Sequence, residues 1–196
     1  IESLYDALPP ELKGDDCALT AKATINFEAT DKSYQEYLAL PLNGRTDTDI
    51  QKKIEAKKKL MGELIQDFKK FDSIGHAGFI VGALYRIGTL YADLNDRLLN
   101  EVTCPAKIGG QKTDDDICEQ FMGILEEMSY EYADSARQGL ELALTSALKK
   151  GIYNEWMLEA QKSVFALMGR TEKSLDYTLL ATDELQSAPE LAEVLQ

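Results

Sequence analysis

Residues 83–91 read Ala-Leu-Tyr-Arg-Ile-Gly-Thr-Leu-Tyr, and their spacing is typical of a helix that packs tightly against another helix. Leu84, Ile87 and Tyr91 recur at steps of three and four residues, so they lie on one helical face. Gly88 lies on the same face and has no side chain, which allows a neighbouring helix to approach closely. The stretch therefore predicts one member of a close-packed helical pair.

The same periodicity predicts helices along most of the chain. Strand-like alternation is nearly absent, and turn residues separate the apolar runs. Helices are expected at about residues 16–40, 46–71, 76–101 and 117–150, with a further helix from Asn154. We expect an all-α fold of antiparallel helical hairpins, because short connections place consecutive helices side by side.

The chain is expected to have three parts. Residues 1–15 form a loosely ordered N-terminal segment, residues 16–169 form the helical domain, and residues 170–196 form a C-terminal helical extension. Because the sequence begins with Ile1 instead of Met, we expect a processed or trimmed chain, and the removal of an export signal stays open.

The charge balance narrows the classes of partner. The 196 residues include 21 Lys and Arg against 34 Asp and Glu, which gives a net charge of −13. Such a surface repels nucleic acid and anionic lipid and favours basic partners. No window approaches eighteen consecutive apolar residues, so we expect no membrane span.

Three cysteines are present. Cys104 and Cys118 flank a loop that contains Pro105, Gly109 and Gly110, which indicates a loop closed by its own ends. We expect a structural disulfide between these two cysteines, with two free thiols as the alternative. Metal binding or redox catalysis would require closer cysteine spacing or histidine partners. A disulfide would indicate an exported protein.

Cys17 lies among alanine and leucine residues and is expected to be a small core residue.

Residues that could carry catalysis are sparse. His76 is the single histidine, lies between two glycines, and is expected to face solvent or to cap a helix. Residues 114–116 are three aspartates that suit a helix N-terminus. Glu126 and Glu127 point about 100° apart on a helix, so they do not converge on one bond. We therefore expect a protein that is not an enzyme and has no cofactor and no metal site.

A group of lysines lies on the second expected helix. It is interpreted as a solvated face or, alternatively, as a basic strip that meets an acidic partner or lipid headgroups. Lys57 also interrupts the apolar stripe of that helix. The members are Lys52, Lys53, Lys57, Lys58, Lys59, Lys69 and Lys70.

Two patterns resemble a known family. Ala136, Leu140, Ala143 and Leu144 alternate small and large side chains, as in the second helix of a tetratricopeptide repeat, and residues 83–91 resemble its first helix. The longer combination of residues 83–88, 104–105, 118 and 153–160 resembles tetratricopeptide proteins of delta-proteobacterial cell envelopes. That group includes the gliding-motility tetratricopeptide component of myxobacteria. The resemblance covers about residues 16–168.

The resemblance implies a short tetratricopeptide-like solenoid with elongated helices. It implies a non-enzymatic scaffold that binds other envelope proteins or peptide segments, in the gliding-motility machinery or another envelope complex. The expected location is the periplasm or the outer-membrane surface, with the cytoplasm as the alternative. By analogy, the partner-binding groove would use Gly82, Tyr85, Thr89, Ala92 and Asp93.

Two other functions stay open. One is a self-assembling structural spacer, which would form homo-oligomers. The other is a helical bundle that holds an apolar small molecule.

Overall fold

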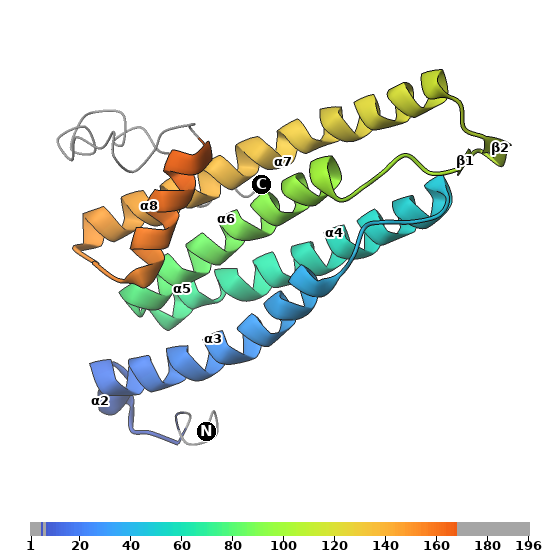
Figure 1. Ribbon diagram of the computed structural model, residues 1–196. Coiled ribbons are helices and arrows are strands. Elements are labelled where there is room, and N and C mark those ends of the chain that lie inside the picture. Colours follow the sequence, from blue (N-terminus) through green and yellow to red (C-terminus); the bar gives the residue numbers. More distant parts are fainter. Residues whose placement is uncertain (1–4, 6, 168–196) are drawn as a thin grey trace.

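A computed structural model describes residue 5 and residues 7–167, and the described chain is almost entirely helical (Figure 1). The predicted all-α class is confirmed. The predicted extension at residues 170–196 lies outside the described residues, as do the last two residues of the predicted helical domain. The helices and strands of the described residues include α2 (Pro10–Lys13), α3 (Asp16–Ala39), α4 (Asp47–Lys69), α5 (Phe71–Ile74), α6 (Ala77–Asn100), β1 (Lys107–Ile108), β2 (Gln111–Lys112), α7 (Asp115–Lys150) and α8 (Glu155–Leu167).

Four long helices lie side by side in chain order. Figure 1 shows α3, α4, α6 and α7 running in alternating directions, so the predicted antiparallel hairpins are present. The most extensive contact joins α6 to α7, and the shorter α8 packs across this pair at one end. Consecutive helices joined by short connections, such as α3 to α4, favour packing side by side.

Local capping explains where the long helices begin and end. The side chains of Thr46, His76 and Asp114 each accept a hydrogen bond from a backbone N–H in the first turn of α4, α6 and α7. The predicted capping role of His76 is therefore confirmed. Gly75 and Gly151 adopt φ values of 82° and 66°, the left-handed conformation that closes α5 and α7 at little steric cost.

The close approach predicted at Gly88 is confirmed. A Cβ atom built on Gly139 of α7 would lie 2.9 Å from the Cα atom of Gly88. A Cβ atom on Gly88 would lie 2.8 Å from Cγ of Leu140. The backbones of α6 and α7 touch at this pair of glycines, and no larger residue fits there without movement.

An aromatic cluster forms the core at the opposite end of the bundle from the β-hairpin. Phe27 of α3 packs on Phe68 and Phe71 with ring centroids 5.8 and 5.4 Å apart. Phe27 also contacts Phe79 of α6 and Trp156 of α8 at 5.5 and 5.0 Å. The cluster joins helices that are far apart in the sequence, as expected for aromatic residues on helical stripes.

The loop between α6 and α7 contains a hairpin that the sequence analysis did not predict. Strands β1 and β2 pair antiparallel around Gly109 and Gly110, whose φ values are 59° and 81°. Two consecutive positive φ angles suit the tight turn of a two-residue hairpin, and a glycine pair adopts them readily. Cys104 and Cys118 flank this hairpin at disulfide distance, with Cα atoms 5.7 Å apart.

The prediction for Cys17 is wrong. Cys17 is exposed, although its apolar neighbours suggested a core position. It lies in the first turn of α3, at the end of the helix that diverges from the other long helices in Figure 1, and the first buried residue of α3 is Ala23. Apolar neighbours in the sequence do not bury a residue where no second helix covers it.

Candidate functional site

The five residues predicted to bind a partner all lie on α6, but the structure gives them different surroundings. Gly82 is buried under α8, since a Cβ atom there would lie 2.7 Å from the Trp156 ring. Thr89 accepts a hydrogen bond from the Tyr34 hydroxyl of α3 at 3.0 Å. Ala92 is partly exposed. The α6 surface between α3 and α8 is therefore partly filled by side chains of this chain.

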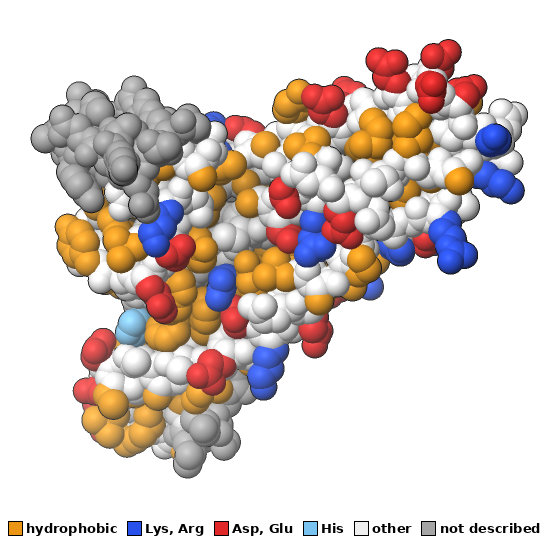
Figure 2. All heavy atoms as spheres, viewed as in Figure 1, with side chains coloured by type: hydrophobic (Ala, Val, Ile, Leu, Met, Phe, Trp, Pro, Cys, Tyr) orange, Lys and Arg blue, Asp and Glu red, His pale blue; other side chains and the backbone are white. Residues whose placement is uncertain are grey.

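Tyr85 occupies the middle of this surface. Burial raises the pKa of its hydroxyl, and Tyr34 of α3 and Glu159 of α8 raise it further. Tyr85 packs against the apolar cluster that includes Ala160 and Val164 of α8, and the next residue, Arg86, pairs with Asp31 of α3, so Tyr85 lies between α3 and α8. Figure 2 shows the molecular surface indented between these helices, with hydrophobic side chains on the floor.

Arg86 is a member of this surface that the sequence analysis missed. Its Nε lies 2.8 Å from Oδ1 of Asp31, and its guanidinium carbon lies 4.5 Å from the centroid of the Tyr34 ring. The ion pair and the ring hold Arg86 against α3. The sequence feature that could have indicated its role is a charged residue within the otherwise largely apolar stretch 79–91.

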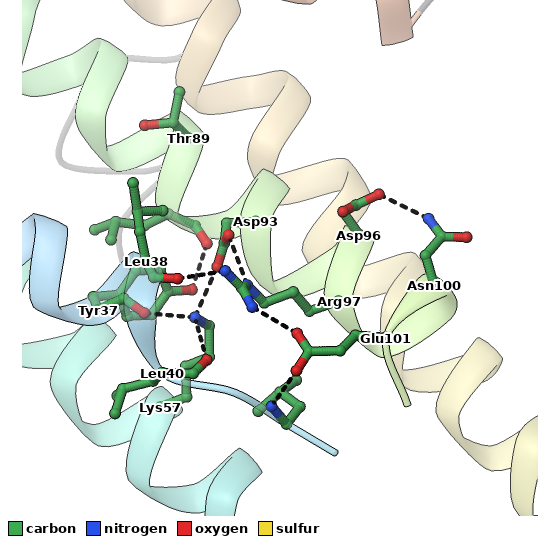
Figure 3. A network of polar contacts seen from close by, with 12 residues as sticks. Tyr37, Leu38, Leu40, Lys57, Thr89, Asp93, Asp96, Arg97, Asn100 and Glu101 are labelled. Atoms are coloured by element: carbon green, nitrogen blue, oxygen red, sulfur yellow. Dashed lines mark hydrogen bonds and ion pairs between the residues drawn. The ribbon is translucent and has the colours of Figure 1, made fainter. Parts of the chain in front are cut away.

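A second polar cluster lies farther along α6 (Figure 3). Nζ of Lys57 lies 2.8 Å from Oδ2 of Asp93. Arg97 pairs with Asp93 at 2.9 Å and with Glu101 at 2.6 Å. We call Lys57, Asp93, Arg97 and Glu101 the charge network.

The charge network forms hydrogen bonds with the C-terminal end of α3. Lys57 donates to the carbonyl oxygen of Tyr37 at 2.6 Å, and Arg97 donates to that of Leu38. Glu101 accepts a hydrogen bond from the backbone N–H of Leu42 at 2.8 Å. The last carbonyls of a helix have no partner within it, and cations there also suit the helix dipole. These contacts attach α3 and its connection to α4 and α6.

The prediction that Lys57 belongs to a solvated face is wrong, since its side chain is 0% exposed. Burial lowers the pKa of its amine, and the hydrogen bond and charge of Asp93 oppose that shift. Its position on the apolar stripe of α4 already placed it toward the core. The Asp93 carboxylate and the carbonyl oxygens at the end of α3 reduce the free-energy cost of burying the Lys57 amine.

The ion pairs of Asp93 also affect its predicted role as a partner-binding residue. Its side chain is 18% exposed, and both carboxylate oxygens face cations of this chain. A partner that contacted Asp93 would compete with Lys57 and Arg97. Its role in partner binding stays a prediction.

Two hollows in the described residues bear on small-molecule binding. One has a volume of about 480 Å³ and lies between α3 and the end of α4. Lys22, Asp67 and Lys70 line it together with Phe71 and Ile74, so it lacks the mostly apolar lining that suits an apolar ligand. The other is apolar, but its volume of about 10 Å³ is no larger than a water site.

In the part of the chain that the structure describes, no helix has both the length and the apolar character needed to cross a membrane. No three side chains among the described His, Cys, Asp and Glu residues come together in a way that could hold a metal ion.

Comparison with known proteins found no family model, no curated protein and no solved structure that matches the chain.

Proposed function

We propose that this protein is a non-enzymatic helical scaffold that binds another protein through the α6 surface between α3 and α8. The observation that carries the proposal is the position of Tyr85, a half-buried aromatic residue between two flanking helices. Tyrosine combines a large apolar area with a polar end and is enriched where proteins bind one another. The indentation in Figure 2 is the place where a helix or an extended segment of the partner would lie.

We propose that fewer residues contact the partner than the five predicted from the sequence. Tyr85 and Ala92 retain accessible surface, whereas Gly82 lies under the Trp156 ring. Arg86 and Thr89 are held by α3 and supply a fixed edge of the surface. Such prior ordering reduces the entropy lost when a partner binds.

The proposed setting is a complex of the bacterial cell envelope, with the gliding-motility machinery as the specific candidate. The tetratricopeptide resemblance supports an assembly role there, and the partners would be other envelope proteins or peptide segments. The cysteine pair at disulfide distance is compatible with an oxidising compartment.

Photocrosslinking in the cells that produce the protein tests the proposal. A photoreactive phenylalanine derivative replaces Tyr85 in one variant and Tyr153 in a matched control. Tyr153 is 79% exposed and lies outside the surface. We expect position 85 to yield a discrete adduct with a second protein that position 153 does not yield.

Other adduct patterns would contradict the proposal. The same adducts from both positions, or none from position 85, would remove this surface as the binding site. An adduct with twice the mass of the chain would instead support the self-assembling spacer.

A further inference from the structure

Helix α7 extends far beyond α8, which packs across α6 and α7 near the C-terminal end of α7. It has 36 residues and α8 has 13, which at 1.5 Å per residue correspond to about 54 Å and about 20 Å. The α8 residues Ala160 and Val164 pack with Leu140 and Ala143 in the C-terminal half of α7. Figure 1 shows no described helix over the outer side of the N-terminal half.

The uncovered half of α7 exposes apolar side chains next to carboxylates. Ile124 is 58% exposed and Tyr130 is 63% exposed. At 100° per residue, both lie within about 60° of Glu127, and Glu131 lies between Ile124 and Glu127. We call Ile124, Glu127, Tyr130 and Glu131 the α7 face. Figure 2 shows hydrophobic side chains over this half of the helix beside a group of acidic ones.

The α7 face has no cation of its own. The sequence contains no Lys or Arg between Lys112 and Arg137, whereas seven Asp and Glu residues fall between positions 115 and 134. Glu127 and Glu131 form no ion pair with any described residue. Covering such a face with apolar or acidic material would desolvate these carboxylates without compensation.

Charge distinguishes three possible occupants. Residues 168–196 of the same chain contain two basic and six acidic residues, so their net charge is −4. A second copy of the chain carries −13. Both carry a net negative charge, whereas a basic segment would pair with the carboxylates of the face.

We propose that the α7 face docks a basic amphipathic segment of another protein. One apolar side chain of the segment packs on Ile124 and the Tyr130 ring, and Lys or Arg side chains reach Glu127 and Glu131. The face lies on a different helix from Tyr85, so this binding is independent of the proposed α6 surface. Failure of either experiment leaves the other proposal standing.

The test uses the full chain and a synthetic amphipathic peptide of leucine and lysine, with its leucine–glutamate counterpart as the peptide control. Fluorescence anisotropy measures the affinity at several salt concentrations. We expect the lysine peptide alone to bind. Ile124→Ser should weaken binding about tenfold, as loss of a central apolar contact does. The double variant Glu127→Gln/Glu131→Gln should weaken binding and reduce its salt dependence.

The matched control is Glu55→Gln/Glu63→Gln, which removes the same charge from exposed positions of α4. It should bind the lysine peptide as the wild type does. Equal weakening by both double variants would show general attraction to an acidic protein and overturn the proposal. Absence of binding would overturn it too. Self-association that Ile124→Ser abolishes would identify a second copy as the occupant and contradict the proposal.

Discussion

At the scale of single residues, the charge network is the most consequential feature. Lys57 is a buried cation whose nearest compensation is the carboxylate of Asp93, 2.8 Å away. Removing one member of such a group is costly because the remaining charge is left without a partner in a poorly solvated place. The network therefore stabilises the fold through mutual dependence among its members.

Asp93→Ala should lower the free energy of unfolding by about 3 kcal/mol, because the buried amine of Lys57 would lose the carboxylate that stabilises its charge. Urea denaturation measures the change. Asp96→Ala is the control on the same helix, since Asp96 is exposed and bonds only to Asn100. The control should change stability by about 0.5 kcal/mol or less. Equal effects of the two substitutions would show that the network contributes nothing beyond an ordinary surface charge.

Glu101 should make the free energy of unfolding depend on pH in the acidic range. Burial alone would raise the pKa of its carboxyl, but hydrogen bonds from the Leu42 amide and Arg97 outweigh burial and lower the pKa below 4.5. The stabilisation is therefore complete above pH 4.5 and is lost as the pH falls through the lowered folded value. Glu101→Gln should lose less stability than the wild type between about pH 7 and about pH 3.

Urea denaturation across that pH range provides the measurement for Glu101. Glu119→Gln, at an exposed position of α7, is the control and should follow the wild-type pH dependence. Parallel curves for Glu101→Gln and the wild type would contradict the assignment.

At the scale of elements, the contact between α6 and α7 depends on the absence of side chains. Gly88 and Gly139 face each other so closely that a Cβ on Gly139 would lie 2.9 Å from backbone. Gly123 lies on the same α7 helix, yet a Cβ there would meet nothing within 4 Å. The two α7 glycines therefore have opposite consequences for stability.

Gly139→Ala should destabilise the protein by about 2 kcal/mol, because α6 and α7 must separate to admit the methyl group. Gly123→Ala should stabilise it by about 0.5–1 kcal/mol, because alanine loses less entropy in an exposed helix. Thermal melts followed by circular dichroism compare the two variants. A stabilising Gly139→Ala would mean that the helices tolerate a wider separation at that point.

At the scale of the whole molecule, the loop between α6 and α7 joins three elements at one end of the bundle. Cys104 and Cys118 lie at disulfide distance, and the backbone N–H of Gly109 donates to Oδ2 of Asp47 at 3.0 Å. Asp47 lies in the first turn of α4. The loop therefore links the end of α6 and the start of α7 to the start of α4.

Reduction of the cysteine pair should lower the free energy of unfolding by about 3 kcal/mol, the chain-entropy value for a loop of this size. Urea denaturation with and without reductant measures the loss. The double variant Cys104→Ser/Cys118→Ser should be as stable as the reduced protein, and reductant should not change its free energy of unfolding. A thiol titration of the native protein should find one reactive cysteine, Cys17, and three would contradict the pairing.

Parts of the candidate site could be predicted from the sequence and parts could not. Periodicity placed Tyr85 and Thr89 on one face of α6, because side-chain direction along a helix depends only on residue spacing. It could not place Asp31, Tyr34 or Trp156 beside that face. Those contacts depend on how α3 and α8 lie against α6, and helix packing does not follow from one helix alone.

The sequence alone was sufficient to predict where the helices lie, which residues cap them and that Gly88 lets another helix approach α6. Each of these features depends on contacts within one helical turn or on the size of one residue. Only the assembled structure revealed the burial of Lys57, the exposure of Cys17 and the surroundings of Asp93. The physical reason is that burial and charge pairing are properties of neighbours in space. These neighbours come from helices that are separated by long stretches of chain.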